Sequence, residues 1–556
     1  MRRTLLLSAG VLLTFLANAQ TKSVYFHQND GTTRISSSAQ IDSIGFSANR
    51  SAALFYLEGK RTASYSIDML DSLTFNQPIQ DASAFPAASD FKKAASGTET
   101  PEYSNVSEPK PATDDSDFIE NFTVKNSIKF TFNGNSVTVS GSVNGVTVKT
   151  SGAHVTVLST KGKMRYLLEG STDNGSFKVI TEDGDADNKK FCLTLNGVKI
   201  TNPSGPAINI QSGKSVYLLL NKNTVNTLCD GTTYSSSASE DQKGTIFSEG
   251  QLLISGTGTL NITSLGGHGI CSDDYIRLRA NTGTINITSL KDGFNTKDKF
   301  IMYGGNVTIN SSKDGVSVRR GPFSLYGGTL DITCADDGIV SDYSNADTAK
   351  VTIEGGYAKI STTEGKGHAI ATSGNLTMTG GAVTATVAGN ASKCINVWGD
   401  INIQGGTVQL KASGEPMYDE EENDYSSSAC IRSRKNLTIS GGTLSLLNTG
   451  KGGKGINTEM ATNITGGTLT IVTEGSNYSV NNTTINSRAL NTQSITVSGH
   501  PTINLSATNV PLYTVGDMNV SGGSIYSYST GNRKDALSVK GTLRQTGGLI
   551  MYGLSE

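Results

Sequence analysis

One short phrase recurs from about residue 205 to the C-terminus: a small residue, an apolar residue, a few polar residues and then a strand interrupted by Gly-Gly. Most copies lie about 22 to 25 residues apart, and the larger spacings, of about 31 to 38 residues, are those expected of a unit with an inserted loop. A unit this short cannot bury its own apolar face, so successive units must stack as a solenoid. The apolar position is filled in turn by Ile208, Ile246, Ile270, Phe294, Val316, Ile339, Ile370, Ile395, Ile431, Ile456, Leu490, Leu512 and Leu537.

The residues around each apolar position alternate with a period of two, which predicts strands rather than helices. Val, Ile and Thr dominate the strand positions, and 63 glycines against 11 prolines suit short strands joined by sharp corners. Leucine-rich repeats need an Asn ladder beside a denser Leu pattern, and propeller blades need roughly 40 residues or more. We therefore predict an all-β fold, a parallel β-helix of about 13 or more coils of 22–25 residues each.

The first residues have the form of an export signal, in which Arg2 and Arg3 precede an apolar run from Leu5 to Leu16 and Ala17-Asn18-Ala19 follows. Residues 1–19 are therefore predicted to be a cleavable signal peptide, and the mature protein is expected to be secreted or held on the cell surface. No later stretch reaches the roughly 18 apolar residues that a membrane helix needs, so no transmembrane segment is expected.

Two further regions precede the repeat. Residues 41–46 (IDSIGF) are echoed by residues 70–75 (LDSLTF), which predicts a small duplicated β module over residues 20–76. From residue 77 to residue 117 the composition shifts to Pro, Ala, Ser, Asp and Glu, as in a flexible linker. The β-helix domain is expected to span residues 118–556.

The charge balance limits the class of partner. Net charge is −2 over 556 residues, and only 17% of residues are charged. This balance argues against a nucleic-acid partner, because affinity for nucleic acid comes largely from neutralising phosphates. The abundance of Thr, Ser and Asn instead indicates an exported protein that meets polysaccharide or other surfaces, and we expect a monomer.

Two of the six cysteines, Cys394 and Cys430, occupy the same position in successive units. Stacking places them one coil apart, within reach of a disulfide in an oxidising compartment. The same position holds small residues in other units, so an interior column of small side chains explains the pattern equally well. The small residues are Gly315, Gly338, Ala369 and Gly455.

Acidic residues recur in register over three units. Asp292, Asp314 and Asp337 each precede a glycine and follow one another at the spacing of a single coil, and Asp336 adds a fourth carboxylate. Stacked coils would align these groups, and a hard cation such as Ca²⁺ prefers oxygen ligands of this kind. Asp-Gly is also a common corner pair, so a series of turns remains the alternative. A second acidic set follows a few residues later in the same units: Asp273, Asp274, Asp298 and Asp342.

Aromatic and basic residues lie in the same units. Tyr303 and Tyr326 each precede Gly-Gly, which predicts an exposed stacked pair that either binds sugar rings or stiffens the sheet. Arg319 and Arg320 are candidates for gripping an acidic sugar. Arg319 or Lys313 would be the base if the protein were a polysaccharide lyase, while charge balance against the aspartates is the simpler explanation.

Three other features carry weaker signals. Trp398, the only tryptophan, is expected to pack at a corner, and the acidic insertion at residues 419–424 is expected to be a solvated loop. His268 and His368 fall at corners of two different coils without a nucleophile at matching spacing. We find no pattern of a hydrolase triad.

Three segments together resemble a known family: residues 226–231 (NTLCDG), 244–248 (GTIFS) and 253–260 (LISGTGTL), followed by the Asp-Gly corners. They are similar to bacterial secreted β-helix proteins with a carbohydrate-binding domain, which are relatives of pectate lyases in shape. The resemblance is best from Lys190 to Leu410 and implies calcium-dependent binding of polygalacturonate-type polysaccharide. His268 replaces a first corner Asp, and Arg319-Arg320 replace small polar residues. The implied calcium ligands are Asp292, Asp314, Asp336 and Asp337, with Asp273, Asp274 and Asp298 as further ligands.

The leading hypothesis is a non-catalytic, calcium-assisted protein that binds acidic, pectin-like polysaccharide on or outside a Gram-negative-type bacterial cell. A polysaccharide lyase that uses Arg319 or Lys313 as base is one alternative. A structural adhesin without glycan specificity is the other.

Overall fold

The computed structural model divides the chain into two compact units: a central unit of residues 98–437, and a terminal unit of residues 1–97 and 438–556. The predicted signal peptide, residues 1–19, lies outside the described residues, as do residues 77–87 of the predicted linker. Among the described residues, no helix has the length and apolar character needed to cross a membrane. The structure describes residues 23–28, 33–37, 41–74, 88–97, 99–110, 112, 116–181, 190–235, 240–342, 348–420, 422–531 and 536–554.

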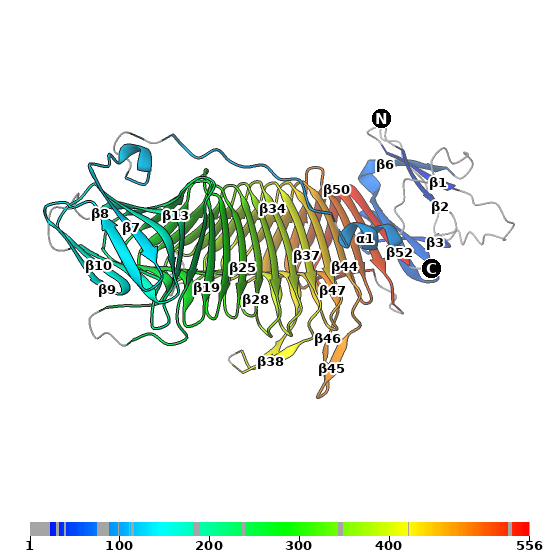
Figure 1. Cartoon of the computed structure of the whole chain (residues 1–556). Coiled ribbons are helices and arrows are strands. Elements are labelled where there is room, and N and C mark those ends of the chain that lie inside the picture. The colour runs from blue at the N-terminus through cyan, green and yellow to red at the C-terminus, as the bar shows by residue number, and fades with distance from the viewer. Residues whose placement is uncertain are drawn as a thin grey trace. The chain divides into compact units, whose positions relative to one another are not determined.

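The fold is all-β, with a parallel β-solenoid of about 15 turns, as the repeat predicts. In the central unit the predicted apolar positions pair directly on successive coils, from Ile208 with Ile246 to Ile395 with Ile431. None of these side chains is more than 2% exposed. In the terminal unit the predicted apolar positions also pair on successive coils, from Ile456 with Leu490 to Leu512 with Leu537. Figure 1 shows the coils of the central unit stacked along one axis, in green to yellow.

Three sheets form the coils of the central unit, and each full coil contributes one strand to each sheet. Sheet 1 contains β10 (Ala153–Ser159), β12 (Gly175–Thr181), β14 (Ile208–Gln211), β17 (Gly244–Ser248), β20 (His268–Ser272), β23 (Phe294–Thr296), β26 (Val316–Val318), β29 (Ile339–Ser341), β32 (Ile370–Thr372), β35 (Lys393–Val397) and β40 (Ala429–Ser433). Sheet 2 contains β7 (Asn126–Asn133), β11 (Met164–Thr172), β13 (Phe191–Thr201), β15 (Val216–Leu220), β18 (Leu252–Ser255), β21 (Tyr275–Leu278), β24 (Lys299–Met302), β27 (Pro322–Leu325), β30 (Lys350–Ile353), β33 (Asn375–Met378) and β36 (Ile401–Ile403).

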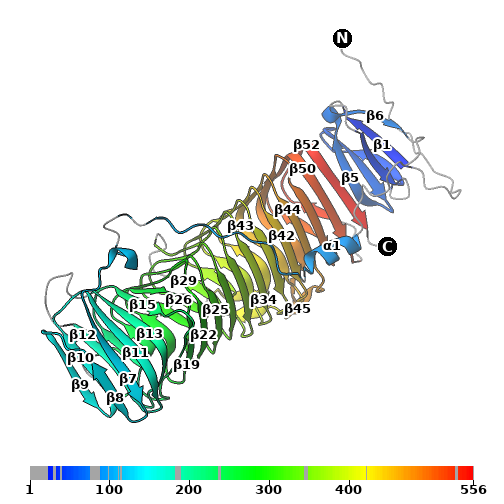
Figure 2. The same cartoon turned by 45° about the horizontal axis from the view of Figure 1, so that its top comes forward.

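Sheet 3 begins with the second half of β13, which pairs with β16. At the start of the unit, β8 (Ser136–Ser140) and β9 (Val146–Ser151) pair antiparallel with β7 and β10 (Figure 2). The hairpin of β38 (Met417–Asp419) and β39 (Asp424–Ser426) fills the long spacing between Ile395 and Ile431. The other strands of sheet 3 are β16 (Val225–Cys229), β19 (Thr259–Ser264), β22 (Thr284–Ser289), β25 (Asn306–Ser311), β28 (Thr329–Cys334), β31 (Tyr357–Thr362), β34 (Ala382–Val387) and β37 (Thr407–Ala412).

Close packing of neighbouring coils requires the glycine of each Asp-Gly corner. A Cβ on Gly315 would lie 2.5 Å from the carbonyl oxygen of Gly338 and 2.5 Å from Cγ2 of Ile332. The same column continues with Ala369, Cys394 and Cys430, and both cysteines are buried and form no disulfide in the described part of the chain. This arrangement agrees with the interior column of small side chains.

Part of the predicted linker lies against the coils of the central unit. The backbone N–H of Val106 donates to the carbonyl of Tyr326 at 2.7 Å, and the ring of Tyr103 stacks on Tyr357. Glu108, whose side chain is buried, accepts hydrogen bonds from Arg277 and Arg279. Residues 103–108, which we call the strap, are therefore held by specific contacts. A 3₁₀ turn, Ile119–Asn121, follows before the first coil.

The terminal unit contains further coils. Helix α1 (Ala88–Ala95) packs its Phe91 ring against Tyr528. A second hairpin, of β45 (Tyr478–Val480) and β46 (Thr483–Ile485), fills the long spacing between Ile456 and Leu490. The remaining strands of these coils are β42 (Thr443–Asn448), β43 (Lys454–Ile464), β44 (Thr468–Thr473), β47 (Arg488–Val497), β48 (Thr502–Ala507), β49 (Leu512–Thr514), β50 (Met518–Ser529), β51 (Leu537–Val539) and β52 (Leu543–Leu554), while β41 (Leu437–Ile439) contains the division between the units.

The terminal unit also contains the N-terminal strands. The two echoed segments become β3 (Ser43–Phe46) and β6 (Leu70–Thr74), which lie in different sheets, and the 3₁₀ turn Ile67–Met69 precedes β6. β6 pairs with β1 (Ser23–Gln28), which also pairs with β2 (Thr33–Ser37), while β3 pairs with β4 (Ala52–Leu57) and β4 with β5 (Lys60–Ser66). β5 then pairs antiparallel with β52, so these strands cover the edge of a coil.

Candidate functional site

A row of polar side chains follows one corner of the central unit, where the strands of sheet 1 begin. Each residue lies two positions before a buried apolar residue, and the pairing of those apolar residues fixes the register of the row. The structure therefore brings the three predicted aspartates together in one axial line. We call this row the corner ladder: His268, Asp292, Asp314, Asp337, His368 and Lys393.

Hydrogen bonds connect successive members of the corner ladder. The backbone N–H of Asp337 donates to Oδ1 of Asp314 at 3.2 Å, and the N–H of His368 donates to Oδ1 of Asp337 at 2.7 Å. The N–H of Lys393 then donates to Nδ1 of His368 at 3.1 Å. An Asp or a neutral His can accept such a bond, whereas a Lys cannot. The relay therefore ends at Lys393, and its earlier bonds run from Asp292 N–H to His268 Nδ1 and from Asp314 N–H to Asp292 Oδ1.

Two ladder carboxyl groups hold protons more tightly than an exposed Asp. Burial raises the pKa of Asp314 to about 7, and the neighbouring charge of Asp292 adds to the shift. Burial also raises the pKa of Asp337 to about 8, together with the charges of Asp314 and Asp336. Burial acts to raise the pKa of Asp292 as well, but the adjacent His268 side chain lowers it overall. The repulsion is therefore concentrated on Asp314 and Asp337.

Asp314, Asp336 and Asp337 fit a cation by the spacing of their oxygen atoms. One carboxylate oxygen from each residue lies within 4.8 Å of the others. Calcium binds oxygen ligands at 2.3–2.6 Å, so oxygens this close can share one ion. These three residues are the ones that would hold calcium at the corner ladder.

The second acidic set lies at the opposite ends of the sheet 1 strands. Asp273 contacts Nζ of Lys243 at 2.6 Å and a guanidinium nitrogen of Arg319 at 2.9 Å. Burial raises the pKa of Asp274, and the charge of Asp298 adds to the shift. The structure therefore places Asp273, Asp274 and Asp298 apart from the corner ladder, and two basic side chains already offset the charge of Asp273.

The predicted basic residues do not gather around the corner ladder. Arg319 is 42% exposed in its ion pair with Asp273, and it follows β26 at the end opposite the ladder. Arg320 and Lys313 are also exposed. Lys313 is the nearer of the three to the ladder, because it directly precedes Asp314 in the sequence.

Tyr303 and Tyr326 form the predicted stack, with ring centroids 4.5 Å apart and ring planes inclined by 12°. Both rings are only half-buried. They follow β24 and β27 of sheet 2, so a full sheet 3 strand separates each of them from the corner ladder in the sequence. The strap runs beside them, and the guanidinium of Arg277 lies 5.2 Å from the Tyr303 ring centroid. The structure thus joins the two tyrosines but does not bring them to the acidic residues.

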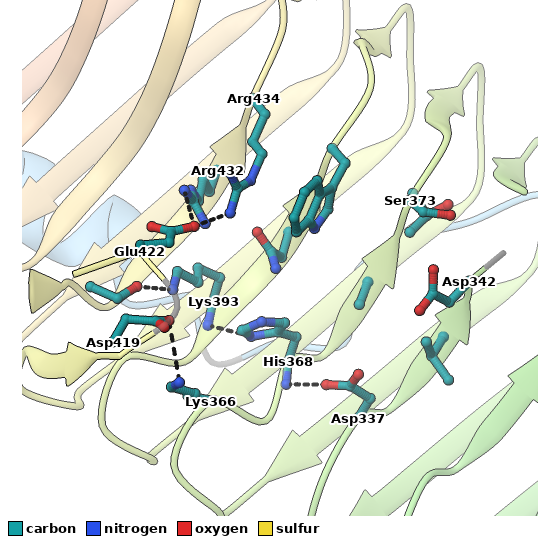
Figure 3. Close-up of a pocket in the computed structure, with 16 residues that line it drawn as sticks. Asp337, Asp342, Lys366, His368, Ser373, Lys393, Asp419, Glu422, Arg432 and Arg434 are labelled. Carbon is teal, nitrogen blue, oxygen red and sulfur yellow. Dashed lines mark hydrogen bonds and ion pairs between the residues drawn. The ribbon is translucent and has the colours of Figure 1, made fainter. Parts of the chain in front are cut away.

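A cleft of about 770 Å³ lies over sheet 1 beyond Asp337 (Figure 3). Its floor contains Val340, Ala371 and Asn396, which pair in register on β29, β32 and β35. The corner ladder lines one side of this floor. The residues after the strands line the other side, and the β38–β39 hairpin contributes a third wall. The wall residues are Asp337, His368 and Lys393; Asp342, Ser373, Trp398 and Arg434; and Asp419, Glu422 and Ser426.

Trp398 is the largest aromatic side chain in the cleft, and 52% of it is exposed. The guanidinium carbon of Arg434 lies 3.7 Å from the centroid of the indole ring, within the range of a cation–π interaction. Arg434 in turn pairs with Glu422 of the hairpin. Trp398 does lie at a corner, as expected, but Arg434 holds it at the surface instead of the coils burying it.

Buried polar groups converge on the floor of the cleft. Asn396 is 7% exposed, and its side-chain oxygen has no hydrogen-bond partner in the described part of the chain. Lys393 is 4% exposed and donates from Nζ to the carbonyl of Ala391 and to Oγ of Ser426, each at 2.7 Å. Burial lowers the pKa of Lys393 to about 7, and the charge of Arg432 adds to the shift.

His368 supplies a neutral donor to the same cleft. Burial lowers the pKa of His368 to about 3, with a contribution from the charge of Lys393, so the ring is neutral at physiological pH. Because Nδ1 accepts the backbone N–H of Lys393, Nε2 carries the ring proton. The cleft therefore combines an aromatic surface, a neutral donor, an amide and several charged groups.

Sequence reasoning missed the role of the acidic insertion. Asp419 pairs with Nζ of Lys366 at 3.2 Å, and Glu422 lies 3.6 Å from a guanidinium nitrogen of Arg432. The insertion is thus a wall of the cleft rather than a free loop. The available signals were the long spacing between Ile395 and Ile431 and the single tryptophan beside it, but the repeat itself specifies no partner for inserted residues.

A family model described as carbohydrate-binding domain-containing protein matches residues 151–373 and 367–536, which is more than half of the chain and includes the corner ladder and the cleft. Among solved structures, the chain is similar to a polysaccharide lyase-like protein from C. thermocellum, studied as a gadolinium derivative. That likeness has 24% sequence identity and a TM-score of 0.36, and it covers 50% of this chain and 96% of the other. No curated protein matches the chain.

Proposed function

The chain belongs to the family of carbohydrate-binding domain-containing proteins, and from this premise we propose that it binds an acidic, pectin-like polysaccharide with the help of calcium and without cleaving it. We also propose that it acts outside the cell, as the export signal at residues 1–19 indicates. The observation that carries the calcium proposal is the spacing of Asp314, Asp336 and Asp337, whose oxygens lie within 4.8 Å of one another.

The electrostatics of the corner ladder support a cation at this place. The raised pKa values of Asp314 and Asp337 reflect charges that burial and mutual repulsion disfavour. A bound Ca²⁺ would place a positive charge beside the ionised carboxylates and so offset their mutual repulsion. Calcium takes six to eight oxygen ligands, so three carboxylates leave positions for water or for the carboxylate of a uronate. The same ion would then stabilise the coils and contribute to binding of the glycan.

The other predicted sugar contacts have weaker support. Tyr303 and Tyr326 are stacked but lie beside the strap, and Arg319 is held by Asp273. Their role in binding, and that of Arg320, stays a prediction. The Arg319–Asp273 pair also gives no advantage to the lyase alternative, because a base must be free to take a proton from the substrate.

Calcium-dependent retention on polygalacturonate tests the proposal. The mature chain is compared in calcium and in EDTA with a variant that carries Asp314→Asn and Asp337→Asn. Asn keeps the side-chain oxygen that accepts the ladder hydrogen bond but removes the charge. We expect calcium to raise the melting temperature and the retention of the wild-type protein, and to change neither for the double variant.

The matched control is Asp331→Asn, which removes an exposed carboxylate paired with Lys359 on sheet 3. This control should keep the full response to calcium. Equal retention of the wild-type protein in calcium and in EDTA would contradict the role of the ion. Unsaturated product absorbing in the ultraviolet would indicate a lyase, and failure to bind any glycan would favour the structural adhesin.

A further inference from the structure

We infer that the cleft over β29, β32, β35 and β40 is the glycan-binding groove, and that it takes a carboxylate-bearing oligosaccharide segment with one sugar ring on Trp398. This inference rests on the proposed function and assigns the sugar to residues other than the predicted tyrosine pair. It is carried by the shape of the cleft, an exposed aromatic ring, an unpaired buried oxygen and the guanidinium groups gathered at one end.

The shape of the cleft suits an extended chain. Its floor follows one outward-facing column of sheet 1, in which Val340, Ala371, Asn396 and Arg432 succeed one another. Neighbouring strands are about 4.8 Å apart, so these four positions span roughly 14 Å along the coil axis. Val340 and Ala371 have shorter, apolar side chains, whereas most of the residues at both corners are polar. A linear oligosaccharide segment laid along the axis would be in contact with floor and walls at once.

Trp398 provides the apolar surface that a sugar ring needs. Its indole is half-exposed, although burying it would be favourable, and Arg434 fixes it from one direction. The pairing of Arg434 with Glu422 anchors the guanidinium to the hairpin. The ring is therefore pre-organised, which lowers the entropy cost of stacking a ligand on it.

Asn396 provides an unmet polar contact. Its side-chain oxygen is buried in the cleft without a partner among the described residues, and such an atom is costly to leave unsatisfied. A sugar hydroxyl is a donor of the kind that would satisfy this acceptor. The Nε2–H of His368 on the adjacent wall is a donor, so the cleft offers a sugar hydroxyl both an acceptor and a donor.

The charges at the hairpin end favour an anionic sugar. Among the described residues, Lys366, Lys393, Arg432 and Arg434 line this end together with Asp419 and Glu422 of the hairpin, whereas Asp337 and Asp342 lie toward the other end. Lys366 pairs with Asp419, and Glu422 lies beside Arg432 and Arg434. A guanidinium can bind a second carboxylate through its remaining N–H groups. A uronate carboxyl group would complete this cluster.

The single tryptophan of the chain makes the inference directly measurable, because fluorescence excited at the indole reports only on Trp398. The mature wild-type protein is titrated with short oligogalacturonides, and calorimetry gives an independent affinity. We expect a saturable change in emission whose midpoint equals the calorimetric Kd. Carboxyl-reduced oligosaccharides of the same backbone should bind at least tenfold more weakly.

Variants then test the individual contacts. Trp398→Ala should lower the affinity at least tenfold, Trp398→Phe should recover part of it, and Asn396→Ala should lower it several-fold. The matched control is Tyr513→Ala in the terminal unit, which removes another aromatic ring under an arginine: Arg488 lies 3.4 Å from the Tyr513 ring centroid. This control should bind as the wild type does.

The outcomes separate the inference from the proposed function. Unchanged emission together with normal calorimetric binding, or full affinity in Trp398→Ala, would place the glycan elsewhere and overturn the inference while the proposed function stands. Equal affinity for carboxyl-reduced ligand would overturn the assignment of a carboxylate-bearing segment. If the wild-type protein binds no acidic polysaccharide in calorimetry, the proposed function fails and the inference falls with it.

Discussion

The acidic and basic halves of the corner ladder occupy the same backbone position, but their side chains form different hydrogen bonds with the next coil. In the acidic half, Asp292, Asp314 and Asp337 each accept the N–H of the next coil, so negative charge accumulates along the axis. In the basic half, His368 accepts the same bond without a charge. Lys393 accepts nothing and donates instead to Ser426 of the inserted hairpin. The position also holds Gly244 and Ala429 in the flanking coils, so the fold does not require a polar group there, and the choice of residue decides what lies beside it.

The terminal unit contains a second example of the basic solution. Lys454 donates from Nζ to the carbonyl of Gly452 at 2.7 Å and to the carbonyl of Asn486 at 2.8 Å. Lys393 likewise bonds the carbonyl two residues upstream and then the hairpin segment. In both units a lysine at the ladder position accompanies an inserted hairpin. This parallel indicates that the lysine fixes the insertion to its coil, and that in the central unit it thereby helps to form the cleft.

The largest expected difference between the two halves is steric. The acidic half has glycine beside the ladder, and a Cβ on Gly315 would lie 2.5 Å from two atoms of neighbouring coils. The basic half has Ala369 and Cys394 at the equivalent position. We expect Gly315→Ala to lower the free energy of unfolding by about 3 kcal/mol, because the crowding atoms include backbone that cannot move freely. Urea denaturation followed by circular dichroism measures the change.

Two controls give this comparison its meaning. Gly213→Ala adds the same methyl group where no atom lies within 4 Å, and it should change stability by no more than about 0.5 kcal/mol. Ala369→Gly in the basic half should cost only about 1 kcal/mol, as a glycine in a strand does. If Gly315→Ala changes the free energy of unfolding no more than Gly213→Ala does, the coils of the acidic half are packed less closely than the distances around Gly315 indicate.

The second expected difference is a pH dependence that belongs to the acidic half. The pKa values of Asp314 and Asp337 are about 7 and 8 in the folded state, above the ordinary value near 3.9. Between about pH 4 and pH 8 the folded state therefore holds protons that the unfolded state has released. The contribution of these two aspartates to the free energy of unfolding falls as the pH rises through this range. We expect a loss on the order of 1 kcal/mol per pH unit in EDTA.

Urea titrations from pH 5 to pH 8 measure this slope. Asp337→Asn cannot titrate but keeps the hydrogen-bond acceptor for His368, so it should flatten the slope by about half. Saturating calcium should flatten it in the wild-type protein, since the ion favours the ionised carboxylates. A slope that is the same in the wild type and in Asp337→Asn would show that Asp337 is ordinary in its titration.

The fold could be predicted from the sequence because each coil repeats the same physical requirement. A buried apolar residue must face its equivalent one coil away, so spacing alone gives the register, and that register aligned Asp292, Asp314 and Asp337 in advance. The Tyr303–Tyr326 stack followed from the same argument. Features that recur with the coil can be predicted from the sequence, because residues one repeat apart lie next to one another on adjacent coils.

The cleft could not be predicted in this way, because its decisive contacts involve inserted residues. Lys366 with Asp419, Lys393 with Ser426 and Arg434 with Glu422 join the coils to the hairpin, and the spacing of the repeat assigns no partner to an insertion. The strap was missed for a similar reason. Its composition is that of a linker, and only three-dimensional contact pairs Glu108 with two arginines that lie far along the chain.

The smallest expected difference concerns Lys393, and its pH dependence has the opposite sign to that of the acidic half. The pKa of Lys393 is about 7 in the folded state, below the ordinary value near 10.4, so between these values the unfolded state holds the extra proton and stability rises with pH. Lys393→Met should remove part of the rise between pH 7 and pH 9.5 and change stability little at pH 6. There the two lost hydrogen bonds are offset by no longer burying an ammonium group. The rise should be flattened but not abolished, because burial also lowers the pKa of Lys454 to about 7 and this lysine keeps its contribution in both proteins. Urea denaturation at both ends of this range measures the difference. Identical slopes of stability against pH in the wild type and in Lys393→Met would mean that Lys393 does not lose its charge over this range.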